Sequence, residues 1–135
     1  LCIILILNFA WSFHINYTKK EWHDDASINY INMVRVHQQA VKYCEEENWS
    51  DRKINTHFLL QQDLTRVAAG YLSSASGFEK VSYNGEIEPD DEIIIFSCIE
   101  FDEGKYNWLK DNSGYQLAKR FEINKAWAEI YTLKE

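Results

Sequence analysis

The amino-acid sequence predicts a three-layer α/β domain with a mixed sheet, flanking helices and a C-terminal β-hairpin, preceded by the end of a transmembrane helix. Residues 90–99, DDEIIIFSCI, contain three consecutive isoleucines and a phenylalanine. A strand covered by helices on both faces is a nearly continuous apolar run, whereas a strand with one face in water alternates. These residues therefore predict a central strand. Apolar residues at helical spacing before it and an alternating tail after it predict the surrounding layers.

Length and composition restrict the class of protein. The chain has 135 residues, 15% of them aromatic and only one of them proline, which fits one folded domain rather than a disordered segment. Its formal net charge of −7 opposes a phosphate-binding surface, so no nucleic-acid partner is expected. The cysteines form no C-x-x-C pair. Cys44 and Cys98 are expected to be small core residues, and a disulfide between them is the alternative.

The first residues are apolar. Residues 1–15, LCIILILNFAWSFHI, are too few to cross a bilayer, which takes roughly 20 apolar residues, but they suit the end of a spanning helix. Aromatic residues of the kind found at the lipid–water boundary follow, namely Trp11, Phe13 and Tyr17. Residues 1–17 are therefore predicted to be the end of a transmembrane helix. The alternatives are a signal-peptide remnant and a buried first strand.

Residues 18–26 are predicted to be a linker, and residues 27–135 a soluble α/β domain. A helix at 27–48 opens this domain, because one stripe of residues recurs at helical spacing: Tyr30, Val34, His37, Val41 and Cys44. The stripe is expected to pack on the sheet. His37 is accordingly interpreted as a histidine at the edge of the core rather than as a ligand.

Two short strands are expected next, at residues 53–60 and 78–83. Asp63 follows the first of them. Ligands gather at the carboxyl ends of the strands in open α/β sheets, so Asp63 is a candidate contact residue, and its alternative role is to cap a helix at 64–72. The serine-rich loop at 73–77 has neither a G-x-G-x-x-G pattern nor a lysine, so we expect no nucleotide and no other cofactor.

The last third of the chain predicts a helix and a hairpin around the central strand. The acidic run at 86–92 lacks the spacing of a calcium-binding loop, so no metal site is predicted. After the central strand come a helix at 102–112 and two alternating strands at 115–121 and 126–133. A period of two places one set of side chains of the last strand on a common face: Trp127, Tyr131 and Leu133.

The tail GYQLAKRFEINKAWAEIYTLKE carries a resemblance to a known family. The residues in the pattern are Gly114, Tyr115, Leu117, Lys119, Arg120, Phe121, Trp127, Ile130 and Tyr131. With the order of elements before it, this tail resembles the C-terminal extracytoplasmic region of bacterial GT-C-type membrane glycosyltransferases, the dolichyl-phosphate-mannose-protein mannosyltransferase-like proteins of glycosyltransferase family 39. The resemblance covers residues 1–135 in order, and the residues that carry it are packing residues.

The resemblance implies a parent protein that moves a sugar from a polyprenyl-phosphate donor to an acceptor on the outer side of the membrane. Its catalytic acidic residue belongs to a loop near the amino-terminal membrane helices, so no catalytic residue is assigned here. We expect a non-catalytic soluble domain on the extracytoplasmic side. Its expected partners are the membrane, through the N-terminal helix, the rest of the parent protein, and the lipid-linked sugar or acceptor.

The expected contact surface contains Asp63, Tyr115, Trp127 and Tyr131. The alternative function is a membrane-tethered α/β binding or interaction module without enzymatic activity. A soluble enzyme would need a nucleophile beside an oriented base. The residue types for such a site are present but scattered along the sequence, at His57, Ser97 and Asp63.

Overall fold

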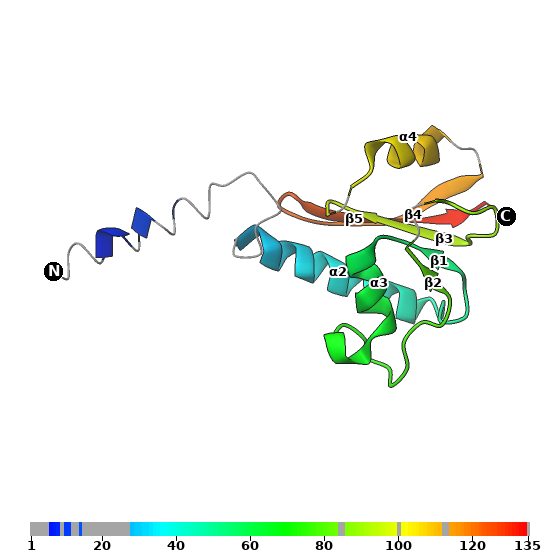
Figure 1. The fold of residues 1–135 in the computed structure, drawn as a ribbon, viewed down its shortest axis with the longest axis horizontal. Coiled ribbons are helices and arrows are strands. Elements are labelled where there is room, and N and C mark those ends of the chain that lie inside the picture. Colours follow the sequence, from blue (N-terminus) through cyan, green and yellow to red (C-terminus); the bar gives the residue numbers. More distant parts are fainter. Residues whose placement is uncertain are drawn as a thin grey trace.

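The computed structural model describes residues 6–8, 10–11, 14, 28–83, 86–99, 101–111 and 114–134. In this part of the chain five strands form one mixed sheet with helices beside it (Figure 1). The elements are helix α2 (Ile28–Glu46), strand β1 (Ile54–Asn55), helix α3 (Phe58–Thr65), the 3-10 helix η1 (Val67–Ala69), strands β2 (Val81–Ser82) and β3 (Ile93–Ser97), helix α4 (Glu103–Asp111), and strands β4 (Tyr115–Ile123) and β5 (Ala126–Leu133). The predicted mixed α/β fold, its flanking helices and its C-terminal hairpin are confirmed.

The strands lie in the order β2-β1-β3-β5-β4. β1 runs parallel to both β2 and β3, while β5 is antiparallel to β3 and to β4. The β4–β5 hairpin turns through Asn124, whose φ of 57° is a left-handed conformation that asparagine tolerates. Because β1, β2 and β3 are parallel, their carboxyl ends meet at one edge of the sheet.

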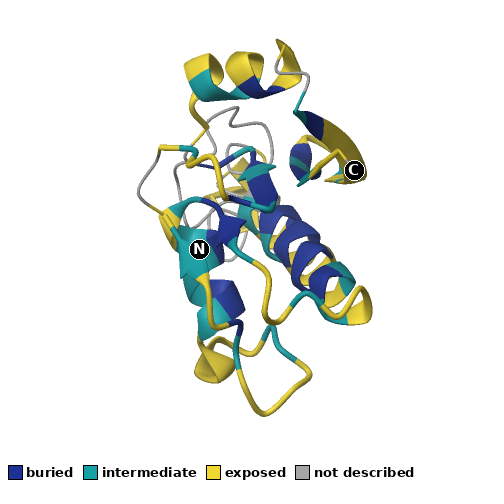
Figure 2. Cartoon of the chain, turned by 90° about the vertical axis from the view of Figure 1, so that its right-hand side faces the viewer, coloured by how far each residue is buried: buried dark blue, intermediate teal, exposed yellow. Residues whose placement is uncertain are grey.

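Helices cover both faces of the sheet, with α2 and α3 on one side and α4 on the other (Figure 1). The larger core lies on the α2 side, where buried residues run along that helix (Figure 2), and it includes Val36, Val41, Ile54, Ile93, Ile95 and Ile130. The smaller core lies on the α4 side and contains Ile94, Leu109, Tyr115 and Tyr131. All three isoleucines of β3 are 2% exposed, so the central strand is covered on both faces as its sequence predicts.

The segment after β1 differs from the prediction. Of the predicted strand 53–60 only β1 pairs with its neighbours, because α3 already begins at Phe58. Helical spacing places three buried residues of α3 together, namely Leu60, Asp63 and Leu64, and this burial outweighs the brief alternation that indicated a strand. The predicted helix 64–72 is therefore wrong. Asp63 lies inside α3 and does not cap a helix.

Of the stripe predicted in helix 27–48, His37, Val41 and Cys44 are buried, whereas Tyr30 and Val34 are half-buried at the edge of the core. His37 is 1% exposed and Cys44 is fully buried. Burial raises the pKa of the Cys44 thiol to about 12. Cys98 is half-buried, and both described cysteines are free thiols, so the alternative disulfide does not form.

The predicted helix end at 1–17 and the linker at 18–26 lie largely outside the described residues. The described positions among them are 6–8, 10–11 and 14, where Ile6, Leu7 and Trp11 are exposed. None of the helices described in the structure is long and apolar enough to span a membrane.

Candidate functional site

A cavity of about 270 Å³ lies at the edge of the sheet where the parallel strands end. Its walls come from the turn after β1, the residue after β2, the strand β3 and the start of α4. The lining includes His57, Phe58, Tyr83, Phe96, Asp102 and Lys105. Ligands of open α/β sheets bind at the carboxyl ends of the parallel strands. The position of this cavity makes it the first candidate for a binding site.

A larger hollow of about 660 Å³ lies at the opposite end of β3, between Trp49, Glu92 and Lys134. In its wall the guanidinium of Arg52 forms an ion pair with the carboxylate of Glu92. This hollow is at the amino end of the central strand, where open α/β sheets do not gather ligands. The smaller cavity is therefore the candidate binding site.

Two aromatic rings stand in the lining of the 270 Å³ cavity. Phe58, the first residue of α3, is 48% exposed, and Tyr83, which follows β2, is 53% exposed. Their ring centroids are 5.7 Å apart and the ring planes meet at 73°. Phe96 of β3 contributes a third, half-buried ring. Neighbouring exposed rings offer a ligand apolar area that water otherwise covers.

The charges in the cavity lining balance. Asp102 and Lys105 form an ion pair with 3.6 Å between Nζ and Oδ2. Asp102 also accepts a hydrogen bond of 3.0 Å from the backbone N–H of Lys105, which ties it to the first turn of α4. A carboxylate and an ammonium that neutralise each other leave no surplus charge for an ionic ligand.

A chain of hydrogen bonds leads from the cavity wall into the core. His57 Nε2 lies 2.8 Å from Ser97 Oγ, and Ser97 Oγ lies 3.2 Å from His37 Nε2. His37 Nδ1 lies 2.9 Å from Asp63 Oδ2. The four residues come from the turn before α3, from β3, from α2 and from α3. The fold thus joins the three scattered candidates of the sequence, His57, Ser97 and Asp63, through His37.

The carboxylate of Asp63 fixes the protons of this chain. A carboxylate only accepts, so His37 Nδ1 donates to it. The other nitrogen of a neutral His37 then accepts from the Ser97 hydroxyl, and Ser97 Oγ in turn accepts from His57 Nε2–H. With His37 neutral, the three donors of this chain all point toward Asp63, and the backbone oxygen of Ile99, 3.3 Å from Ser97 Oγ, is a second acceptor for the Ser97 hydroxyl.

The order serine, histidine, aspartate is also that of a catalytic triad. Here Ser97 and His37 are each 1% exposed, which keeps a substrate carbonyl away from Oγ. The hydroxyl is also enclosed by the second imidazole, His57, and by the backbone of Ile99 at 3.3 Å. The arrangement is a buried polar network of the kind that fixes a unique packing.

Burial of the ring, with the neighbouring His37 as a second cause, lowers the pKa of His57 to about 3. The ring centroids of the two histidines are 5.5 Å apart. A cation at His57 would lose its hydration and lie beside another basic group, so the neutral imidazole is the stable form. The cavity therefore has a neutral histidine in its wall.

The substitution His57→Gln is expected to flatten the pH dependence of stability between about pH 5 and 6.5. The unfolded chain takes up a proton near the ordinary histidine pKa of about 6.5, whereas the folded chain does not. Stability from the neutral ring is thus present above that pKa and falls as the pH drops below it, by up to about 1.4 kcal/mol per pH unit. Urea unfolding over this pH range measures the slope. Equal slopes for both proteins would contradict the lowered pKa.

The sequence-predicted contact residues take internal positions. Tyr115 is 8% exposed and donates a hydrogen bond of 2.9 Å to the backbone oxygen of Asp91. Tyr131 is 4% exposed and donates one of 2.7 Å to Glu129. Trp127 is half-buried against other rings, and Asp63 ends the buried network described above. The structure does not bring these four residues together at the cavity.

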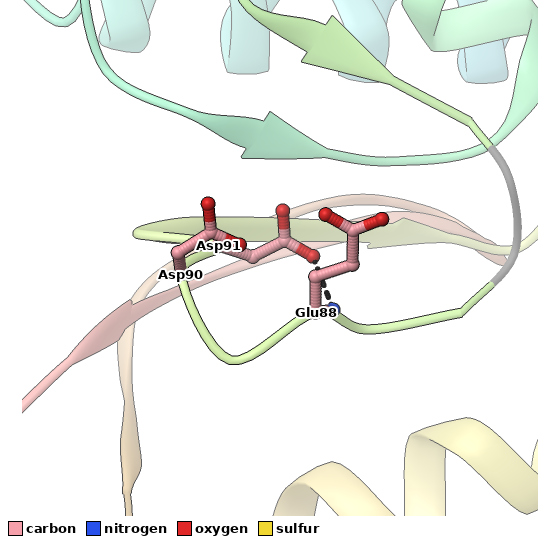
Figure 3. A group of neighbouring side chains, drawn as sticks. All are labelled: Glu88, Asp90 and Asp91. Atoms are coloured by element: carbon pink, nitrogen blue, oxygen red, sulfur yellow. Dashed lines mark hydrogen bonds between the residues drawn. The ribbon is translucent and has the colours of Figure 1, made fainter.

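The acidic run before β3 forms a compact cluster in which the carboxylates of Glu88, Asp90 and Asp91 point to the same side (Figure 3). Their oxygens are close enough to share a cation. The ammonium of Lys53 already lies there, 2.5 Å from Glu88, 2.7 Å from Asp90 and 3.7 Å from Asp91. Hydrogen bonds to Asp90 and Glu88 raise the pKa of Lys53. The protein itself thus supplies positive charge to the cluster.

Asp91 also organises the loop before β3. Its side chain is fully buried, and its Oδ2 accepts hydrogen bonds of 2.6 Å from Asn55 Nδ2 and 2.7 Å from the backbone N–H of Glu88. These bonds tie the end of β1 to the loop. The cluster therefore has a structural role at the start of the central strand.

The serine-rich loop at 73–77 binds the carboxylate of Glu45, a side chain of the same protein. The backbone N–H groups of Ser73 and Ser74 donate to the carboxylate of Glu45 over 2.9 and 3.1 Å, and the Ser73 hydroxyl donates over 2.7 Å. Burial opposes ionisation of Glu45, but these hydrogen bonds outweigh it and hold the pKa of the carboxyl below its ordinary value. The donors that a phosphate would need are occupied.

Sequence reasoning missed the two aromatic residues that line the cavity beside His57. Phe58 lies within a predicted strand and Tyr83 at the end of another, and neither belongs to a motif. One rule could have found them. Tyr83 directly follows β2, and Phe58 comes shortly after the end of β1, at the edge where ligands of such sheets bind.

Comparison of the chain with protein-family models, with curated proteins and with solved structures finds no match.

Proposed function

We propose that this chain is the non-catalytic, C-terminal domain of a membrane glycosyltransferase that uses a polyprenyl-phosphate sugar donor, and that it binds the acceptor or the lipid-linked sugar. The observation that carries the proposal is the aromatic-lined cavity at the carboxyl ends of β1, β2 and β3. In this proposal residues 1–17 are the end of a transmembrane helix, and the domain lies on the extracytoplasmic side.

The buried network supports binding rather than chemistry. An acid–base pair has to touch the reacting atoms, within about 2.6–3.2 Å. The serine and histidine that have the geometry for this, Ser97 and His37, are closed inside the core. What the cavity offers a ligand is aromatic area, a neutral imidazole and one balanced ion pair. Groups of this kind hold a molecule in place.

The alternative is a membrane-tethered binding or interaction module that stands alone. The gene upstream of the Leu1 codon discriminates between the two functions. Several further membrane spans, with an acidic residue in the first loop between them, would support the transferase domain. A start codon directly before Leu1 would contradict it and leave the binding module.

Incubation of the purified chain with a labelled polyprenyl-phosphate sugar and candidate acceptors tests the absence of chemistry. We expect no transferred or released sugar, because Ser97 and His37, the pair with the geometry of a nucleophile and its base, are each 1% exposed. Turnover that disappears in a Ser97→Ala variant would contradict the proposal, since it would show that the buried network is catalytic.

A further inference from the structure

We infer that the acidic cluster before β3 binds one calcium ion through Glu88, Asp90 and Asp91, and that the ion displaces the ammonium of Lys53. The inference does not rest on the proposed function, since none of these residues lines the aromatic cavity. It follows from a buried carboxylate oxygen that lacks a hydrogen-bond donor, from the way the loop holds that oxygen, and from the charge of the cluster.

One carboxylate oxygen of the cluster is buried without a donor. Asp91 is fully buried, and its Oδ2 accepts two hydrogen bonds whereas its Oδ1 accepts none. The ammonium of Lys53 stays 3.7 Å from this Oδ1, which is beyond hydrogen-bond length. An ionised oxygen that is buried without a donor costs free energy, and a bound cation is one way to satisfy it.

The unpaired oxygen of Asp91 points to the side on which the other two carboxylates lie (Figure 3). One oxygen from each of Glu88, Asp90 and Asp91 lies within 4.8 Å of the others. Calcium binds oxygens at roughly 2.3–2.6 Å, so two oxygens on either side of one ion are separated by a distance of this size. A single ion can therefore contact all three carboxylates.

The loop holds Asp91 in this orientation through its other oxygen, which accepts from Asn55 Nδ2 over 2.6 Å and from the backbone N–H of Glu88 over 2.7 Å. The backbone N–H of Asp91 also donates to the carbonyl of Glu88 over 3.0 Å, and Pro89 stiffens the turn between them. The buried ligand is thus fixed in advance. The side chains of Glu88 and Asp90, 48% and 74% exposed, have room to close on an ion together with water.

The charge of the cluster suits a divalent cation. The ammonium of Lys53 offsets one of the three carboxylates, so an ion that replaces it brings two positive charges where the protein supplies one. Carboxylate oxygens are the ligands that hard cations prefer. Magnesium demands a near-ideal octahedron, whereas calcium accepts irregular sets of oxygens, and two of the three carboxylates here are on mobile, exposed side chains.

Lys53 can leave the cluster without disturbing the sheet. Its ammonium is carried by a flexible four-carbon stem, and the side chain is 25% exposed. Its backbone oxygen accepts from the N–H groups of Glu92 and Ile93 over 3.0 and 3.1 Å, which keeps the main chain in place. The ammonium and the ion are therefore competitors for the same oxygens.

Calorimetric titration of the full chain with calcium chloride, at constant ionic strength, tests the inference. We expect one ion per chain with a Kd of about 10⁻⁴–10⁻³ M, the weak end of the range for calcium sites in proteins. Magnesium chloride should bind at least about tenfold more weakly. Binding of magnesium as strong as that of calcium would overturn the inference, and so would a lack of calcium binding up to about 10 mM.

Asp90→Asn and Glu86→Gln form a matched pair. Each removes one exposed negative charge from the same loop, but Asp90 belongs to the cluster and Glu86 does not. Asp90→Asn should weaken calcium binding at least about tenfold, because even the outer partners of a metal ligand contribute that much. Glu86→Gln should change it by less than about twofold, since exposed charges are screened. Equal affinities of the two variants would show that the ion is attracted by the net charge alone.

Lys53→Gln tests the competition. Without the ammonium, calcium should bind at least about threefold more tightly, because no group of the protein then has to be displaced. In calcium-free buffer the variant should unfold at a lower urea concentration than the wild type, since three carboxylates then repel one another, and calcium should restore the midpoint. Binding no tighter than that of the wild type would overturn the inference.

The buried oxygen has its own readout in the wild-type chain. The ¹³C chemical shift of the Asp91 carboxyl carbon should move with added calcium along the same binding curve as those of Glu88 and Asp90. Shifts of Glu88 and Asp90 alone would mean that the buried oxygen is not a ligand, and would overturn the site. None of these measurements involves a polyprenyl-phosphate sugar, so the calcium site and the proposed function can fail separately.

Discussion

Replacement of Ile95 by alanine is expected to lower the free energy of unfolding by about 2–5 kcal/mol. Ile95 is 2% exposed and belongs to the core on the α2 side of the sheet. The substitution removes buried methyl and methylene groups and leaves a cavity that the close-packed surroundings fill only in part. Ile94, on the opposite face and also 2% exposed, should give an effect of similar size. Urea unfolding of each variant measures it.

Leu117→Ala is the control for these variants. Leu117 lies on β4 and is 51% exposed, so its truncation should change stability by no more than about 0.5 kcal/mol. An unchanged urea midpoint for both Ile94→Ala and Ile95→Ala would contradict a central strand covered on both faces. A loss for only one of them would assign the core to one side.

His37→Leu is expected to destabilise the fold by about 3 kcal/mol or more. The histidine joins Asp63 to Ser97, and its removal leaves a carboxylate that is 9% exposed without its 2.9 Å partner. A buried charge that loses its partner keeps its cost of desolvation and loses the attraction that offset it. The change is measured by urea unfolding at neutral pH.

The double variant His37→Leu, Asp63→Leu distinguishes a carboxylate left without its hydrogen-bond donor from lost packing. Removal of both partners leaves no unpaired carboxylate, so the double variant should recover much of the stability that the single variant loses. Ser97 keeps an acceptor in the backbone oxygen of Ile99 at 3.3 Å. A double variant less stable than His37→Leu would contradict the pairing and indicate that shape alone decides this site.

Local patterns in the sequence were sufficient for the central strand and the hairpin. The isoleucines of β3 form a continuous apolar run that fits a strand buried on two sides. The side chains of β5 divide between the two faces with a period of two, with Ala128 and Ile130 in one core and Tyr131 in the other. The start of α3 was missed because residues 53–60 alternate over too few positions to separate a strand from a helix. The helix is favoured because it buries both Leu60 and Leu64.

The candidate site could not be predicted from the sequence because its contacts are long-range. His37 and Asp63 are 26 residues apart, and His37 and Ser97 are 60 apart. No local period joins them. The sequence also could not show that Tyr115 and Tyr131 are internal. Their hydroxyl groups form hydrogen bonds inside the domain, and the partners are set by the fold. Phe58 and Tyr83 meet only because β1 and β2 are parallel neighbours.

The most direct test of a binding domain without chemistry is a ¹H–¹⁵N NMR titration of the full chain with a water-soluble, short-chain polyprenyl-phosphate sugar. We expect the largest shifts at His57, Phe58, Tyr83 and Phe96, which line the cavity, with the sugar recovered unchanged. Shifts that concentrate instead around Trp49 and Lys134 at the opposite end of β3, or release of the sugar during the titration, would contradict the proposed site and its role.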